Sequence, residues 1–301
     1  MRAVVVHETG GPEVLRLEDV DPPTPGEGEV LIRVHAASVN PIDWKYRRGY
    51  ADKPLPAVLG NDASGVVEES NAEGFSPGDE VFGFVASGAY AEAATAAAGA
   101  IAAKPAGLTY EQAAALPVAA LTAWQALFDK GGLERGRTAL IAGAAGGVGH
   151  LAVQFARHAG ARTIGTGSTR NREFVEGLGA DEYVDYTRQE VADAVRDADV
   201  VFDTVGGETT ATLVPTLADG GIIVTIAAAP PVDAAGERGA RAELLVAQPN
   251  PAQLARVAEL VASGEVRVEI AEVIPLDEIA RAHELSEAGH VRGKLVLSVG
   301  G

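Results

Sequence analysis

The stretch that most constrains the fold runs from residue 138 to 160 and reads TALIAGAAGGVGHLAVQFARHAG. Its first five residues form a short apolar run, as in a buried parallel strand, and a burst of glycine and alanine follows. From Val148 onward the apolar residues recur at the spacing of one helix face, and Gly160 supplies a C-terminal stop. The stretch is therefore predicted to form a strand, a tight glycine turn and a helix.

Such a turn is suited to an anion. The first N–H groups of a helix have no intrahelical partner, and the helix dipole adds partial positive charge. Small residues let a diphosphate approach the main chain, and Ala144-x-Gly146-x-x-Gly149 matches the dinucleotide fingerprint with alanine in its first place. Alone the match is weak, because the chain holds 36 glycines and such a turn can serve only to pack a helix on a strand.

The sequence after Gly160 strengthens the dinucleotide interpretation. Strand-like and helix-like segments alternate as ARTIGTG, REFVEGLG, EYVDY, RQEVADAVRD, ADVVFDTVGG, TATLVPTLADG and GIIVTIA. Five strands separated by helical segments predict an α/β fold with a doubly wound parallel sheet. The glycine turn follows the first of these strands, where the phosphate site of such a sheet belongs.

The end of the second strand indicates which dinucleotide binds. A site for NAD places a carboxylate there to accept from the ribose hydroxyls, whereas this chain reads GTGSTR at residues 165–170. Ser168, Thr169 and Arg170 are donors suited to a 2′-phosphate, so NADPH is the predicted cofactor. The alternative is that Arg170 is a solvated residue opening a helix.

The flanking segments have a different pattern. Residues 1 to about 120 contain short alternating runs between turn signals, which predicts a mostly β domain. The C-terminal residues read VRVEIAEVIPL, DEIARAHELSEAG and GKLVLSVG, a strand, a helix and a strand. They have no place in the central sheet and are expected to return to the first domain.

The net charge, apolar stretches and cysteine content limit the kinds of molecule that this chain can bind. With 301 residues the chain can form two domains, and its formal net charge of -18 repels nucleic acid and anionic lipid. The longest apolar stretch contains Pro117 and is too short to span a bilayer, so no membrane partner is expected. The chain has no cysteine, which favours a cytoplasmic location.

Motifs along the whole chain carry a family resemblance: HETGGPEVL, ASVNPIDWKYRRG, LPAVLGNDASGVV, PGDEVFG, GAYAE, AALPVAALTAWQAL, AGAAGGVGHLAVQFARHAGA, LGADEYVDY, DTVGG and HVRGKLVLSV. The sequence resembles the zinc-free, zeta-crystallin-like quinone oxidoreductases of the medium-chain dehydrogenase/reductase superfamily. The resemblance implies a Rossmann sheet inserted into a GroES-like substrate domain, with residues 1–122 and 266–301 in the substrate domain and 123–265 in the cofactor domain. It also implies NADPH-dependent reduction of a quinone or another conjugated carbonyl, an enone.

The resemblance also indicates whether the chain binds a catalytic zinc ion. Zinc alcohol dehydrogenases of this superfamily hold the catalytic ion with a Cys, a Gly-His-Glu and a second Cys, where this chain has Asn40, then Asn61 with Asp62, then Val118. The six histidines show no close helical pairing of the kind that binds zinc. No metal is predicted, which favours a conjugated acceptor, because conjugation spreads the charge that a Lewis acid otherwise stabilises.

The resembling enzymes place NPIDWKYRRG against nicotinamide and substrate. This implies Asn40, Lys45 and Tyr46 as hydrogen-bond donors, with Asp43 orienting Lys45, although many relatives have tyrosine where Lys45 stands. The alternative is a helical turn fixed for packing, with its charges in solvent. By the same resemblance the cofactor contacts would be Thr122, Gly146, Gly147, Val148, Ser168, Arg170, Tyr186, Val205, Ile226 and Ala227.

Other functions stay open at this point. One is an enoyl-thioester or biosynthetic C=C reductase of the same superfamily, and another is a structural or sensing protein that binds NADPH with little turnover. A methyltransferase using the same glycine turn is a third, disfavoured by the missing acid and the flanking β domain. The segment from Ala240 to Gln248 looks like a sixth strand at the sheet edge, where unpaired backbone groups invite pairing with another chain. In the resembling enzymes this edge pairs across a twofold axis, so the resemblance implies a homodimer.

Overall fold

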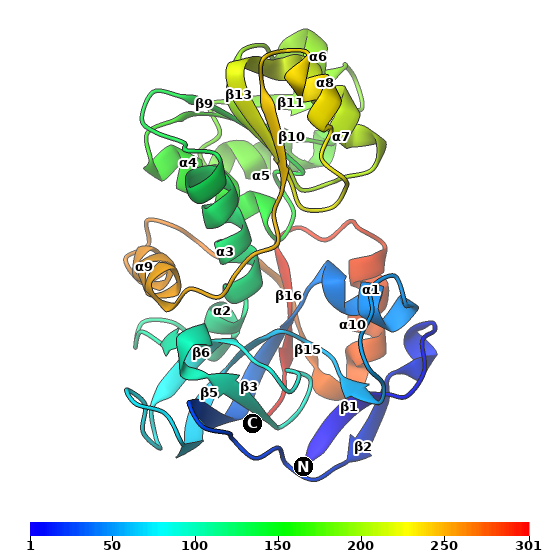
Figure 1. The fold of residues 1–301 in the computed structure, drawn as a ribbon, viewed down its shortest axis with the longest axis vertical. Helices are drawn as coiled ribbons and strands as arrows, with labels where there is room; N and C mark the ends of the chain where they lie inside the picture. The colour runs from blue at the N-terminus through cyan, green and yellow to red at the C-terminus, as the bar shows by residue number, and fades with distance from the viewer. Residues whose placement is uncertain (301) are drawn as a thin grey trace. The chain divides into compact units, whose positions relative to one another are not determined.

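A computed structural model describes residues 1–300, and the chain forms two compact units (Figure 1). Residues 1–121 and 249–301 make up the first unit, and residues 122–248 make up the second. The sequence placed the second boundary after residue 265, beyond helix α9 (Pro251–Ala262). In the structure α9 packs against β8 (Ile101–Ala103) of the first unit, which gives cover to its apolar face.

The second unit is built on a six-stranded sheet in the order β11-β10-β9-β12-β13-β14, with every neighbouring pair parallel. The order reverses at β9, the strand before the glycine turn, as in a doubly wound dinucleotide-binding sheet, so the predicted fold class is confirmed. The strand bounds are β9 (Thr138–Ala142), β10 (Arg162–Gly167), β11 (Glu182–Asp185), β12 (Ala198–Asp203), β13 (Leu217–Thr225) and β14 (Arg241–Leu244).

Helices connect these strands. Their bounds are α3 (Pro117–Trp124), which runs across the unit boundary, η3 (Gln125–Lys130), α4 (Gly149–His158), η4 (Thr169–Asn171), α5 (Arg172–Gly177), α6 (Val191–Ala194), α7 (Glu208–Leu213), η5 (Val214–Thr216) and α8 (Val232–Gly236). The helix predicted for RQEVADAVRD is reduced to α6. Val195 leaves the helical conformation and is buried in the core, so burial of this side chain overrides the weak helical periodicity.

The first unit is mostly β, as predicted. A three-stranded sheet has the order β2-β1-β4, and a second sheet has the order β15-β16-β3-β5-β6-β8, with β7 also pairing with β3. The bounds are β1 (Arg2–Val6), β2 (Arg16–Asp19), β3 (Glu29–Val39), β4 (Ala57–Val58), β5 (Asp62–Ser70), β6 (Glu80–Phe84), β7 (Ala93–Ala97), β15 (Ile270–Pro275) and β16 (Lys294–Ser298). β16 pairs with β3, so the C-terminal segment returns to the first domain as expected.

The other helices of this unit are η1 (Pro12–Val14), α1 (Pro41–Arg48), η2 (Ala98–Ala100), α2 (Tyr110–Ala114), η6 (Leu276–Glu278) and α10 (Ile279–Glu287). Helix α1 begins directly after β3. Asn40 is its N-cap, Pro41 takes the first helical position, where a missing N–H does no harm, and Gly49 ends the helix at a φ of 76°. These signals place the segment predicted to face the substrate on one short helix.

Candidate functional site

The carboxyl ends of the parallel strands in the second unit gather nearly all predicted cofactor residues. Each lies in the loop that follows β9, β10, β11, β12 or β13: Gly146, Gly147, Val148, Ser168, Arg170, Tyr186, Val205, Ile226 and Ala227. In open α/β sheets ligands bind outside these strand ends, at the point where the strand order reverses. Thr122 is the exception, because it lies on α3 and is buried.

The glycine turn after β9 is closed tightly by backbone. Gly143 has a φ of 72°, which favours glycine, and its carbonyl accepts the N–H of Gly146 at 3.0 Å. A Cβ on Gly149 would stand 2.2 Å from the Gly143 carbonyl oxygen. Helix α4 can therefore begin directly after the turn only if residue 149 is glycine. Gly147 and Val148 then lie at the helix N-terminus, where backbone N–H groups can bind an anion.

The loop after β10 carries the residues predicted to select the cofactor. Ser168 is half-buried and its carbonyl accepts a hydrogen bond from the Tyr183 hydroxyl at 2.7 Å. Arg170 lies on the exposed 3-10 turn η4 that follows. The backbone is thus held in place while the guanidinium side chain reaches the surface, the arrangement that a charged group of a ligand needs.

Asp185 supports the loop that carries Arg170, and it is not among the residues predicted from the sequence. It ends β11, and its carboxylate accepts hydrogen bonds from the Thr169 hydroxyl and from the Thr187 hydroxyl and N–H. The Thr169 and Thr187 hydrogen bonds lower the pKa of Asp185. The end of the second strand lacks an acid, but a carboxylate on the neighbouring strand ties down the loop that carries Arg170. The signal was the DYT sequence at residues 185–187, which begins at the last residue of β11.

The loops after β11 and β12 expose apolar side chains at the same edge. Tyr186 is 60% exposed and Val205 is 52% exposed. The buried Asp203 shapes the second of these loops, because its carboxylate accepts the N–H groups of Val205 at 2.9 Å and Gly206 at 3.1 Å. Exposed apolar groups on anchored loops can cover the flat rings of a bound nucleotide.

The loop after β13 completes this edge. Ile226 is half-buried, and its N–H donates to the Asp203 carbonyl at 3.2 Å. Ala227 is exposed. Backbone hydrogen bonds therefore hold this loop beside the end of β12, as a site formed by adjacent strand ends requires.

In the first unit Asn40 belongs to a buried polar network. Its side chain is 2% exposed, Nδ2 donates to Asp62 Oδ2 at 2.8 Å, and Oδ1 accepts from Lys294 Nζ at 2.5 Å. Asp62 also accepts from the Ser38 hydroxyl at 2.8 Å and from the Val118 N–H at 3.0 Å. Residues at the places of the three zinc ligands thus lie in one hydrogen-bonded cluster.

Asp43 forms the other half of this network. It accepts the Asn40 backbone N–H and the Tyr90 hydroxyl, each at 2.8 Å, and the Asn61 amide at 2.9 Å. Burial raises the pKa of Asp43 to about 6, and the hydrogen bonds from Asn40 and Tyr90 oppose the shift. The expectation that Asp43 orients Lys45 was wrong, because its carboxylate is engaged by these partners instead.

Lys294 is the cation of the network, and the sequence analysis did not single it out. Burial lowers the pKa of the Lys294 ammonium, and the carboxylates of Asp62 and Asp43 oppose the shift. Burial likewise raises the pKa of Asp62, and Lys294 opposes it. The signal was a lysine at the start of the apolar strand KLVLS, where a buried charge is expensive unless it has partners.

Lys45 and Tyr46 lie on α1 outside this network. Both are half-buried, Lys45 Nζ lies 5.9 Å from the centre of the Trp44 ring, and Lys53 Nζ lies 5.5 Å from the centre of the Tyr46 ring. Tyr46 also packs against the apolar core of this unit. Of the three predicted donors, Lys45 and Tyr46 are therefore the two whose side chains make no hydrogen bond with the buried charged residues.

Residues 1–300 hold neither a cluster of metal-ligating side chains nor a helix that could cross a membrane. No group of three or more His, Cys, Asp or Glu side chains in this range is placed to hold a metal ion. No helix within it is both long enough and apolar enough to cross a membrane.

A mostly β unit with a doubly wound unit inserted into it, and a strand-end site, define a two-domain dinucleotide-binding protein. Two family descriptions match the sequence: an alcohol dehydrogenase GroES-like domain over residues 26–120 and a zinc-binding dehydrogenase over residues 178–297. Among curated proteins, 2-methylene-furan-3-one reductase of Solanum lycopersicum is 35% identical, over 99% of this chain and 79% of its own length.

Solved structures agree. The quinone oxidoreductase of Coxiella burnetii matches with a TM-score of 0.94 and 38% identity, over 100% of this chain and 99% of that one. The Escherichia coli quinone oxidoreductase complexed with NADPH matches with a TM-score of 0.91 and 28% identity, over 99% and 100%. The chain belongs to the quinone oxidoreductase family of the medium-chain dehydrogenase/reductase superfamily, as its motifs predicted.

Proposed function

We propose that the protein is an NADPH-dependent oxidoreductase that reduces a quinone or an enone. The observation that carries this proposal is the strand-end site of the second unit, where Arg170 takes the place of the carboxylate that an NAD site has. The relatives support it, since one is a reductase of a methylene-furanone and another is a quinone oxidoreductase that binds NADPH.

The residues of the second unit fit this cofactor. The N–H groups at Gly147 and Val148 would bind the diphosphate, because a helix N-terminus attracts anions and glycine at 146 and 149 keeps the approach open. Ser168 and Arg170 would donate to the 2′-phosphate. The exposed rings and methyl groups of Tyr186 and Val205 would pack against the nucleotide.

NADPH, when bound, would supply a hydride to the conjugated acceptor. The side chains of this chain would stabilise the negative charge on the acceptor oxygen until a proton is taken up, on oxygen for a quinone or on the carbon next to the carbonyl for an enone. Lys45, Tyr46 and Asn40 are the proposed donors, and conjugation spreads the charge enough for hydrogen bonds to suffice. Metal independence is part of the proposal, since the Asp62 carboxylate is already satisfied by Ser38, Asn40 and Val118.

A screen of NADPH oxidation tests the proposal. The purified chain would be incubated with NADPH and a panel of quinones, enones and enoyl thioesters, and the absorbance at the reduced-nicotinamide band followed. We expect turnover with quinones or enones. Turnover with enoyl thioesters alone, or no turnover with any of the panel while NADPH still binds, would overturn it.

We also propose a homodimer that pairs through the edge of the second unit's sheet. β14 is the terminal strand of that sheet, and Leu244 and Val246 are exposed beside it, at 48% and 70%. An unpaired strand edge with apolar neighbours favours pairing with a second copy. Light scattering at micromolar concentration should give twice the mass of 30.8 kDa, and a monomeric mass would refute the dimer. A cytoplasmic location stays a prediction of the sequence.

A further inference from the structure

A buried ammonium faces an amide at the start of α1. Lys294 is 3% exposed, and its Nζ donates to Asn40 Oδ1 at 2.5 Å and to the Val39 carbonyl at 3.3 Å. Within residues 1–300 it forms no direct ion pair, so both of its partners are neutral. A buried lysine of this kind is a poor way to stabilise a fold, which points to another use.

The Asn40 side chain connects this ammonium to a carboxylate. Its Nδ2 donates to Asp62 Oδ2 at 2.8 Å while its Oδ1 accepts from Lys294. An ammonium can only donate and a carboxylate can only accept, so the amide has one allowed orientation. The direction of the second Nδ2 proton is then set by the plane of the amide.

We propose that Lys294 is a positioning residue for the reduction, acting through Asn40. The ammonium holds the amide oxygen and draws electron density toward it, which makes the remaining Asn40 N–H a better aligned and stronger donor. The inference rests on the proposed role of Asn40 toward the acceptor oxygen. It adds a residue that lies 254 positions away in the chain and does not touch the substrate.

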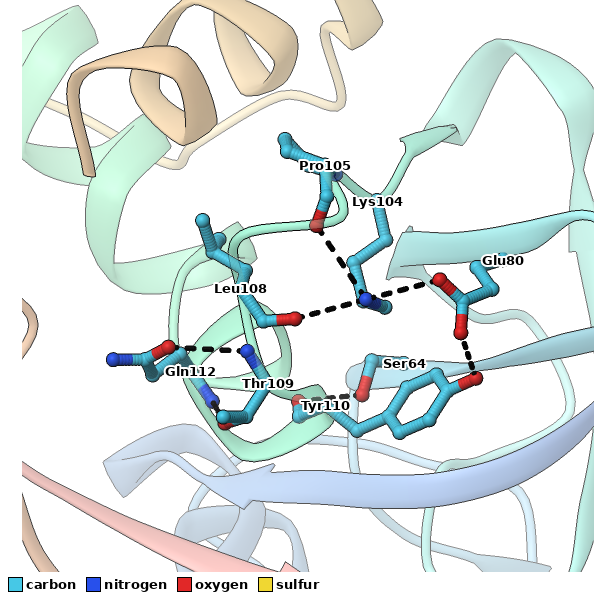
Figure 2. Close-up of polar contacts among 8 residues, drawn as sticks. All are labelled: Ser64, Glu80, Lys104, Pro105, Leu108, Thr109, Tyr110 and Gln112. Carbon is cyan, nitrogen blue, oxygen red and sulfur yellow. Dashed lines mark hydrogen bonds and ion pairs between the residues drawn. The ribbon is translucent and has the colours of Figure 1, made fainter. Parts of the chain in front are cut away.

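Lys104 of the same unit provides a matched control. Its side chain is 5% exposed, and Nζ donates to the Leu108 carbonyl at 2.8 Å and lies 3.1 Å from Glu80 Oε2 (Figure 2). Figure 2 also shows the Tyr110 hydroxyl on the other Glu80 oxygen. This lysine is comparably buried, but its partners include none of the residues around α1.

The first experiment compares Lys294→Met with Lys104→Met. We expect Lys294→Met to lower kcat roughly ten- to a hundredfold, as loss of an aligned transition-state hydrogen bond does, while the Kd for NADPH is unchanged. Lys104→Met should lower Tm but keep kcat. A kcat for Lys294→Met within about twofold of wild type would overturn the proposal, and so would an equal loss in Lys104→Met.

A double-mutant cycle tests the route through Asn40. If Lys294 acts through this amide, Lys294→Met combined with Asn40→Ala should be about as slow as Asn40→Ala alone. Effects that multiply would contradict the proposal. Should Lys294→Met fold poorly because the buried Asp62 carboxylate loses the nearby positive charge, adding Asp62→Asn removes the negative charge. The combined variant should then fold and remain slow, and wild-type kcat in it would overturn the positioning role.

A readout independent of turnover separates this inference from the proposed function. In ¹⁵N–¹H spectra the Asn40 side-chain amide, assigned by its loss in Asn40→Ala, should shift and exchange faster with water in Lys294→Met and not in Lys104→Met. An unchanged amide signal would overturn the inference. No turnover in wild type, together with a shifted amide, would instead refute the proposed function while confirming that Lys294 orients Asn40.

Discussion

Several side chains predicted to be functional are exposed in the second unit, whereas those of the first unit are buried or half-buried. At the strand ends of the second unit, Arg170, Tyr186 and Val205 reach the surface and the backbone beneath them is anchored by Asp185 and Asp203. In the first unit Asn40, Asp43, Asp62 and Lys294 are buried and bond to one another. The first pattern suits binding of a large ligand, and the second suits exact placement of a few donors.

The difference has an energetic consequence. A surface arginine interacts with its ligand through water-screened charge, so its removal affects binding and leaves stability nearly unchanged. Removal of one member of a buried network leaves a partner unsatisfied, which destabilises the fold. Ligand binding and fold stability should therefore respond separately to substitution of the exposed residues of the second unit. Within the buried network of the first unit, activity and stability should change together.

The largest effect is expected at the glycine turn. Gly149→Val would place side-chain atoms against the Gly143 carbonyl, since even a Cβ would stand 2.2 Å away. Helix α4 must then move off the turn, and NADPH binding should become too weak to measure by calorimetry. Gly236→Ala in the same unit, where a Cβ meets nothing within 4 Å, is the control and should bind normally. Near-normal affinity in Gly149→Val would show that the diphosphate does not use this turn.

Asn40, the N-cap of α1, and Lys45, on the helix itself, allow a buried and a half-buried donor to be compared at one place in the chain. Asn40→Ala and Lys45→Ala should each lower the rate roughly ten- to a thousandfold with little change in NADPH affinity. Asn40→Ala should also destabilise the fold by about 1–3 kcal/mol, because Asp62 and Lys294 lose a shared partner. Lys45→Ala should leave Tm unchanged. Steady-state kinetics and thermal unfolding distinguish the cases, and wild-type rates in both variants would mean that the turn serves packing only.

Arg170 tests the exposed pattern. Arg170→Ala should weaken NADPH binding by roughly ten- to a hundredfold and leave NADH binding and Tm nearly unchanged, because a guanidinium bond to a phosphate contributes about 1.5 to 3 kcal/mol. Arg162→Ala, an exposed arginine at the other end of β10, is the control. Calorimetric titration with both cofactors checks this. Equal losses for NADPH and NADH would remove Arg170 from the 2′-phosphate site.

The buried pattern predicts a pH dependence of stability. The folded-state pKa of Asp43 is about 6 against 3.8 for an ordinary aspartate, so folding takes up a proton between about pH 4 and pH 6. Stability from this group is present at the low end of that window and is lost as pH rises through it. Relative to Asp43→Asn, wild type should lose about 2 kcal/mol from pH 4 to pH 6. Denaturant unfolding of both proteins at intervals of pH measures this, and parallel curves would contradict it.

The smallest expected effect is that of metal removal. Because Asn40 and Val118 both donate hydrogen bonds to the Asp62 carboxylate, we expect dialysis against a strong chelator to leave the rate unchanged. The check is the NADPH-oxidation rate before and after dialysis. A large loss of rate that zinc restores would show that the network opens to bind an ion.

Much of the second unit could be predicted from sequence. Its strands and helices follow from local periodicity, and the glycines mark the turn that a diphosphate needs. The contacts of the buried network in the first unit could not be predicted in this way. Lys294 and Tyr90 carry no local pattern that links them to Asn40 and Asp43. Asp185 contacts the loop after β10 only because β11 pairs with β10 in the sheet.

By itself the sequence determined the class of fold, the position of the glycine turn after β9 and the absence of a carboxylate at residues 165–170, because each depends on residues close together in the chain. Only the tertiary structure decided which charges are buried and what they contact. Pairing of β16 with β3 brings Lys294 to the start of α1, and β5 brings Asp62 to the same place. Burial and pairing over such distances depend on strand register, which no local pattern specifies.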